Sequence, residues 1–91
     1  MIARHLLICG RVQGVGFRHW LLRAAREAGV VGWVRNRSDG QVEAVLAGDP
    51  GAVARLAARC RLGPPGAWVE AVTETPAELP EEAGFRRLQT L

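Results

Sequence analysis

The sequence contains no lysine and no tyrosine, and it has one serine, one asparagine and two cysteines. Without lysine the chain lacks the side chain that reaches the terminal phosphates in a Walker-type nucleotide loop, and also the amine of a Schiff-base enzyme. No apolar run approaches the roughly 18 residues that a membrane-spanning helix needs. Two separated cysteines are too few for a disulfide framework, so we expect Cys9 and Cys60 to be free, buried thiols.

The length of 91 residues predicts a single domain over residues 1–91, and the hydrophobic fraction of 48% is typical of a globular protein. The apolar start, Met1 to Cys9, is too short for a signal peptide and has no small-residue cleavage site after it, so we expect a cytoplasmic protein. The net charge is +3, and every basic side chain apart from the two histidines is arginine. Anion binding in this chain would therefore depend on guanidinium groups, which grip phosphate bidentately.

The first half of the chain predicts a strand, a loop, a helix and a hairpin. Residues 3–9 are rich in aliphatic side chains and predict a strand, whereas 10–16 contains three glycines and predicts a loop. An apolar stripe at helical spacing follows, ended by Gly29, and it consists of Phe17, Trp20, Leu21, Ala24, Ala25 and Ala28. Two strand-like runs, 30–37 and 41–47, are joined by Ser38-Asp39-Gly40, a strong hairpin signal.

The second half predicts another helix and further strands. Asp49-Pro50 offers an N-cap and a proline at the first helical position, and the buried face that follows would consist of Val53, Leu56, Ala57 and Cys60. A strand over 68–75, an acidic loop over 76–84 and a last strand over 85–91 complete the chain. The order βαββαβ with a short C-terminal strand indicates an α+β protein, a ferredoxin-like α/β sandwich with two helices on one face of an antiparallel sheet.

The glycine-rich loop is the first candidate site. It follows a strand and opens into a helix, which directs free backbone N–H groups and the positive helix end at an anion. Gly14 and Gly16 let the backbone curl around an oxyanion, and Arg18 can bring a guanidinium to the same point. A tight strand-to-helix turn with a solvated arginine remains the alternative. The third glycine of a dinucleotide-binding motif is missing, since His19 occupies its position.

Asn36, at the end of the strand that leads into the hairpin turn, is the second candidate. Local hydrogen bonds beside the turn are the alternative for this side chain. Other combinations are weaker. Ser38 has no neighbouring histidine in sequence, so a triad with His5 or His19 lacks support. His5 and Cys9 share a strand face but provide no third metal ligand. Solvent-exposed side chains are expected at Glu78, Glu81 and Glu82, and core or sheet-face positions at Trp33 and Trp68.

Several segments together resemble the acylphosphatase family in order and spacing. They are GRVQGVGFR over 10–18, GWVRN over 32–36, Asp39-Gly40-x-Val42-Glu43, Gly48 and Gly63-Pro64. The resemblance covers essentially the whole chain, and the first string is nearly diagnostic. The end of the chain, FRRLQTL, lacks the aromatic residue often found near the C-terminus of the family, which leaves the packing of the last strand open.

The resemblance implies a metal-independent hydrolase that converts an acyl phosphate into a carboxylate and inorganic phosphate, without a cofactor. Arg18 would bind phosphate oxygens and Asn36 would hold the attacking water. The loop backbone would cradle the phosphate through Val12, Gln13, Gly14, Val15, Gly16 and Phe17. The leaving carboxylate is a weak base, so no general acid is required. Phosphate or another anion in the loop and a small acyl phosphate are the expected partners.

Two other functions remain open at this point. The same sandwich serves as an RNA-binding module, but the RNA-binding version displays aromatic side chains on its middle strands, and 3–9 and 41–48 have none. The second is an acylphosphatase-like domain that works, or binds carbamoyl phosphate without catalysis, inside a larger carbamoyl-transfer protein. Because the chain ends at its expected last strand, we expect a free-standing enzyme. We also expect a monomer that binds neither nucleic acid nor membrane.

Overall fold

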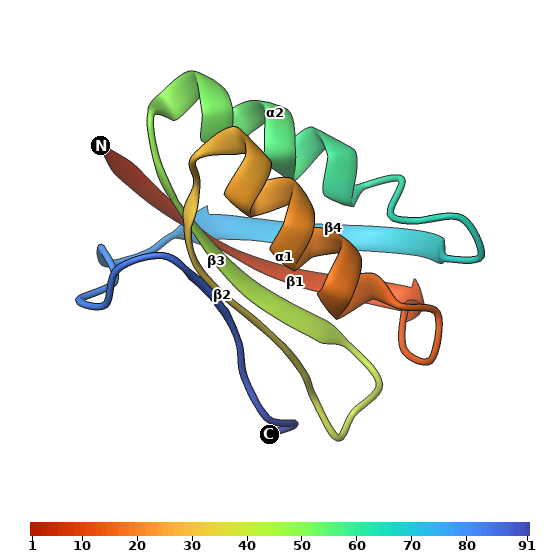
Figure 1. Ribbon diagram of the computed structural model, residues 1–91. Coiled ribbons are helices and arrows are strands. Elements are labelled where there is room, and N and C mark those ends of the chain that lie inside the picture. The colour runs from red at the N-terminus through yellow and green to blue at the C-terminus, as the bar shows by residue number, and fades with distance from the viewer.

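The computed structural model describes residues 1–91 as a five-stranded sheet with two helices on one of its faces (Figure 1). The strands follow one another in the order β4-β1-β3-β2-β5. This is the α/β sandwich predicted from the sequence. The elements are β1 Ile2–Arg11, α1 Phe17–Ala28, β2 Val31–Asn36, β3 Val42–Gly48, α2 Pro50–Cys60, β4 Trp68–Pro76 and β5 Phe85–Arg87.

Four strands are antiparallel as predicted, but the fifth is not. β1 pairs with β3 and β4, and β2 pairs with β3, all antiparallel, whereas β5 lies parallel to β2. β4 ends at the end of the sheet where β2 begins, and the segment 77–84 crosses the sheet there, so that the Gly84 carbonyl accepts a bond from Gly32 N–H (3.1 Å). β5 therefore has to leave in the same direction as β2. The sheet is mixed.

Two predicted strand boundaries differ from the structure by two residues or more, and several others differ by one. The last strand covers only Phe85–Arg87 instead of 85–91, although the chain continues beside β2 through single bonds from Leu88 N–H to Val34 O (2.8 Å) and from Leu91 N–H to Asn36 O (3.0 Å). β1 reaches Arg11 instead of ending at residue 9, because the register shift between Cys9 and Gly10 lets pairing with β4 resume. Side chains larger than glycine do not fit at Gly10, where a Cβ would lie 2.2 Å from the Trp68 carbonyl oxygen.

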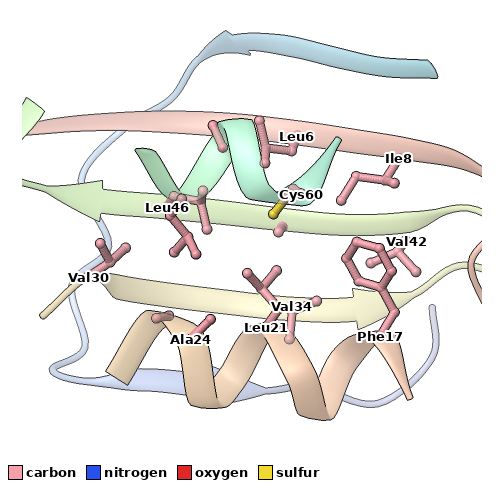
Figure 2. Packing of buried hydrophobic residues seen from close by; sticks show 14 of the residues in the cluster. Leu6, Ile8, Phe17, Leu21, Ala24, Val30, Val34, Val42, Leu46 and Cys60 are labelled. Carbon is pink, nitrogen blue, oxygen red and sulfur yellow. The ribbon is translucent and has the colours of Figure 1, made fainter. Parts of the chain in front are cut away.

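The core lies between the helices and the covered face of the sheet (Figure 2). From α1 it takes Phe17, Leu21, Ala24 and Ala25, while Trp20 is half-buried and Ala28 is exposed. The buried face of α2 consists of the four predicted residues Val53, Leu56, Ala57 and Cys60. Full burial of each larger aliphatic side chain stabilises the fold by about 1.5–3 kcal/mol before the conformational entropy is subtracted.

The two cysteines are free, as predicted. Cys60 is buried as predicted, and Figure 2 shows its sulfur among the core side chains. The predicted burial of Cys9 is wrong, because this residue of β1 is only half-buried. Burial raises the pKa of the Cys60 thiol to about 12. This thiol is therefore a neutral core group at neutral pH.

Local signals placed both helix starts and the hairpin correctly. The Asp49 carboxylate accepts a bond from Ala52 N–H (3.1 Å), with Pro50 in the first turn of α2. Between β2 and β3 the Arg37 N–H donates to the Gln41 carbonyl (2.9 Å), and Gly40 has a φ of 91° in the turn. The hairpin loop is thus residues 37–41, slightly longer than the predicted three-residue turn.

The sheet face without helices carries a polar cluster around Glu43, which is 7% exposed. Its carboxylate accepts a bond from Arg35 Nε (2.7 Å), lies 2.7 Å from His5 Nε2 and is 3.4 Å from the Arg37 guanidinium. Burial raises the pKa of Glu43, but the bonds to His5 and Arg35 outweigh it, so the pKa is lowered overall. The buried charge is therefore compensated on three sides.

The remaining predictions about surface residues are largely confirmed. Glu78, Glu81 and Glu82 are exposed. Trp33 is half-buried on the open sheet face, with the Arg35 guanidinium 4.8 Å from its ring centroid. Trp68 lies in β4 but is 70% exposed. No helix is long and apolar enough to cross a membrane.

Candidate active site

The candidate site lies at the end of the sheet where α1 begins and β2 ends. Six of the eight predicted site residues line one hollow of about 180 Å³ there: Val12, Gly14, Gly16, Phe17, Arg18 and Asn36. His19 and Arg87 line it as well. Val12 and Phe17 are buried, so they contribute backbone atoms and packing rather than exposed side chains. The remaining two predicted residues, Gln13 and Val15, do not line the hollow.

The loop backbone presents a run of free donors. The N–H groups from Gln13 to His19 donate to no protein acceptor, because they precede the first intrahelical bonds and have no side-chain cap. Gly14 and Gly16 hold this path with φ of 75° and 80°, a region that favours glycine, and a Cβ at either position would meet no atom within 4 Å. Donors at the positive end of α1, open to solvent, form a concave anion-binding backbone.

The side chain of Gln13 points to the hairpin instead of the hollow. Its amide donates to the Arg37 carbonyl (2.7 Å) and to the Gln41 carbonyl (2.9 Å). These two bonds join the glycine-rich loop to the turn that follows Asn36. Gln13 thus positions the two halves of the site relative to each other, a role that its place in the sequence did not reveal.

Two arginine side chains face the hollow without a carboxylate partner. Arg18 stands in the first turn of α1 and Arg87 at the end of β5, and neither is in an ion pair. Burial and, second, the charge of Arg87 lower the pKa of the Arg18 guanidinium. The mutual repulsion of two guanidinium groups at a helix N-terminus is relieved when an anion lies between them.

Arg87 was not predicted as a site residue from the sequence. It pairs with Val34 in the parallel β2–β5 ladder, and Asn36 follows Val34 by two residues, so the three side chains share the helix-covered face of the sheet. Only the parallel direction of β5 brings Arg87 to the same end as Asn36. No local pattern in FRRLQTL distinguishes Arg87 from Arg86, which instead pairs with Glu82 (3.0 Å).

Asn36 reaches the hollow as predicted. Its backbone is held by pairing with Val42 and by the bond from Leu91 N–H, whereas its side-chain amide bonds to no protein group. A half-buried amide that is fixed by its backbone and free at its tip can hold a water molecule in one orientation.

The weaker alternatives lie elsewhere or lack partners. His5 is bonded to Glu43 on the open sheet face, and Cys9 belongs to the same strand β1. Ser38 is exposed in the hairpin loop. No group of three or more His, Cys, Asp or Glu side chains converges in a way that could hold a metal ion.

Fold and site together define a ferredoxin-like α/β sandwich with a cradle of free backbone donors, two guanidinium groups and one free amide. A family model described as Acylphosphatase matches residues 4–87. Acylphosphatase of Acidiphilium cryptum is 54% identical over 90 residues, 99% of each chain, and that of Nitrobacter hamburgensis is 53% identical over 93% of this chain and 86% of its own. The chain belongs to the acylphosphatase family.

Solved structures agree with this assignment. The crystal structure of acylphosphatase from Bacillus subtilis superimposes with a TM-score of 0.92 at 31% identity, covering 97% of this chain and 99% of that one. A full-length HypF in a phosphate- and nucleotide-bound form matches with a TM-score of 0.89 at 25% identity, but there the match covers 12% of the longer chain. The predicted family, ferredoxin-like fold class and acylphosphatase hydrolase function are confirmed.

Proposed function

We propose that the chain hydrolyses acyl phosphates by direct attack of a water molecule that Asn36 holds, with the phosphate bound by Arg18 and the loop N–H groups. The observation that carries the proposal is the convergence of the unpaired Arg18 guanidinium, the free Asn36 amide and a set of unpartnered backbone N–H groups on one hollow. These N–H groups belong to Gly14, Gly16, Phe17, Arg18 and His19. The substrate is a small acyl phosphate, and the products are a carboxylate and inorganic phosphate.

The phosphoryl group would lie over the N-terminus of α1. There the backbone from Val12 to Phe17 supplies donors that are already in place, so little reorganisation accompanies the reaction. Arg18 adds a bidentate contact, and Arg87 adds a second positive charge at the same end of the hollow. The glycines keep the approach open, since their backbone carries no side chain where the anion enters.

The chemistry is consistent with this set of groups. The water oxygen forms a bond to phosphorus while the bond from phosphorus to the acyl oxygen breaks. The carboxylate leaves unprotonated because it is a weak base. The transition state is loose and spreads negative charge over the phosphoryl oxygens, which the loop donors and Arg18 stabilise. The proton of the water passes to a phosphate oxygen of the substrate.

Two variants separate binding from turnover. Arg18→Gln lowers both phosphate affinity and kcat/KM, by about 100- to 1000-fold for kcat/KM, the range found for lost oxyanion donors. Asn36→Ala lowers kcat by a similar factor but leaves the inhibition constant of inorganic phosphate within about twofold, because it removes only the water's partner. Arg61→Gln serves as the charge-matched control, since Arg61 is an exposed side chain at the end of α2.

The assay is hydrolysis of acetyl phosphate in the presence of a chelator. Full activity of Asn36→Ala would remove the water-positioning role. Activity that disappears with the chelator and returns with a divalent metal would overturn the metal-independent mechanism. Turnover of carbamoyl phosphate alone, or binding without turnover, would favour the carbamoyl-phosphate-binding alternative.

The organisation of the protein is part of the proposal. We take residues 1–91 to act as one acylphosphatase-like domain, supported by a single sheet and by a family match over most of its length. A monomer in the cytoplasm that binds no nucleic acid stays the prediction.

A further inference from the structure

A second hollow of about 320 Å³ lies directly beside the glycine-rich loop, which is called the phosphate loop below. Its lining comes mostly from α1, with Arg59 as the one residue from α2, and it includes Gly16, His19, Trp20, Arg23, Glu27 and Arg59. Gly16 and His19 line the phosphate hollow too, so the two hollows share a wall. A substrate bound in the first hollow therefore lies next to the second.

The dimensions suit a short chain with charged groups at both ends. Arg23 follows His19, which lines both hollows, by four residues, so the two side chains share one face of α1 and their backbones are separated by a rise of roughly 6 Å. Helical side chains lean toward the N-terminus of their helix, which moves the Arg23 guanidinium closer to the phosphate loop than its backbone is. The acyl part of a substrate, a few carbons long, bridges such a distance.

The second hollow is positively charged and contains no ion pair. Neither Arg23 nor Arg59 is within salt-bridge distance of a carboxylate, although Glu27 belongs to the same lining. By contrast, five arginines on the sheet, in the hairpin loop and at the end of α2 are paired with acids: Arg4, Arg35, Arg37, Arg61 and Arg86. Arg11, Arg26 and Arg55 are in no ion pair either, but of the unpaired arginines only Arg23 and Arg59 line this hollow.

Trp20 gives this hollow a rigid wall. The Trp20 ring packs edge-on against the Phe17 ring, with the ring centroids 5.4 Å apart and the planes at 71°. From α2, the Arg59 guanidinium lies 5.4 Å from the centroid of the Trp20 ring. Stacking on an indole restricts the rotamers of Arg59 and leaves its N–H groups available at the ring's edge. The guanidinium already lies at the hollow in the structure.

We propose that this hollow is a subsite for a second anionic group carried by the acyl part of the substrate. The inference rests on the proposed function, since the phosphate end must lie in the loop. Arg23 and Arg59 bind the distal carboxylate or phosphate, His19 borders the passage between the hollows, and Trp20 contacts the connecting carbons. The subsite selects doubly anionic acyl phosphates over uncharged acyl groups of the same length.

The test compares succinyl phosphate with butyryl phosphate, which have equal chain length and differ by a terminal carboxylate in place of a methyl group. The measured quantity is the ratio of kcat/KM for the two substrates. In Arg23→Gln and in Arg59→Gln we expect this ratio to fall about fivefold, mainly through KM for succinyl phosphate, as for one partly solvated charge pair. Raising the ionic strength should lower the ratio in the unsubstituted protein as well.

Arg61→Gln is the matched control. It removes the same charge two residues after Arg59, roughly 200° around the helix axis, and should leave the ratio unchanged. A ratio within twofold of the unsubstituted protein in both Arg23→Gln and Arg59→Gln, or an equal fall in Arg61→Gln, overturns the subsite. Failure of the unsubstituted protein to hydrolyse either substrate would instead overturn the proposed function. Inorganic phosphate inhibition in all variants checks that the loop is intact.

Discussion

Replacing Gln13 by methionine tests how the two halves of the site are held together. The Gln13 amide makes two bonds, 2.7 Å and 2.9 Å long, from the phosphate loop to the hairpin that carries Asn36. Methionine has nearly the same shape but donates no hydrogen bond. Both carbonyls keep one backbone donor each, because Gly40 N–H donates to the Arg37 carbonyl and Arg37 N–H to the Gln41 carbonyl. No buried acceptor is therefore left without a partner.

The expected loss of stability follows from the two hydrogen bonds that the substitution removes. Two net hydrogen bonds contribute about 2 kcal/mol together, and the remaining partners keep the penalty from growing beyond that. In a domain of this size such a loss lowers Tm by roughly 10 °C. The catalytic loss is larger than the loss of stability suggests, since a shift of about 1 Å between a nucleophile and its target can lower the rate as much as 100-fold. We expect kcat to fall at least about tenfold, with phosphate inhibition changed less.

Thermal unfolding followed by circular dichroism and acetyl phosphate kinetics measure both effects. Gln89→Met is the control, because Gln89 is exposed and makes no hydrogen bond with the protein. If Gln13→Met has the same Tm as Gln89→Met and an unchanged kcat, the two hydrogen bonds do not position the loop. A large fall in Tm with unchanged kcat would leave Gln13 a purely structural role and refute the coupling to Asn36.

The remaining predictions concern stability and reactivity. Because the folded pKa of Glu43 is lowered, its contribution is present near neutral pH and is lost as the pH falls through the ordinary glutamate value of about 4.3 and below. In urea unfolding, Glu43→Gln should lower the free energy of unfolding by about 2 kcal/mol near neutral pH and by less at about pH 3. An equal decrease at both pH values would contradict a stabilising role of the Glu43 charge. Cys60, with its thiol pKa raised to about 12 by burial, should react with thiol reagents only as fast as the protein unfolds, whereas half-buried Cys9 reacts faster. Rapid labelling of Cys60 in the folded protein would show that the core opens locally.

Much of the fold was predictable because its signals are local. The stripe from Phe17 to Ala25 defines α1, Asp49-Pro50 starts α2, and the hairpin follows from Asp39-Gly40. Each depends on residues a few positions apart. The glycine-rich loop belongs to the same class, since positive φ at Gly14 and Gly16 is a property of the glycines themselves.

The parts that were not predicted depend on contacts between distant segments. The direction of β5 is decided by where β4 ends and by the crossing over 77–84, and Arg87 enters the site only through that direction. Gln13 could be placed in the loop, but its bonds to Arg37 and Gln41 require the hairpin to fold against it. The second hollow needs the packing of α1 against α2, which no single helix pattern contains.

The stereochemistry at phosphorus distinguishes direct attack by water from a mechanism with a covalent phosphoenzyme. An isotopically chiral acyl phosphorothioate, hydrolysed in oxygen-labelled water, reports whether one or two displacements occur at phosphorus. Direct attack by the water at Asn36 is a single in-line displacement, so we expect inversion of configuration with the label in the thiophosphate product. Retention would reveal a covalent phosphoenzyme, and label in the carboxylate would show attack at the acyl carbon. Either result would contradict the mechanism proposed for the loop, Arg18 and Asn36.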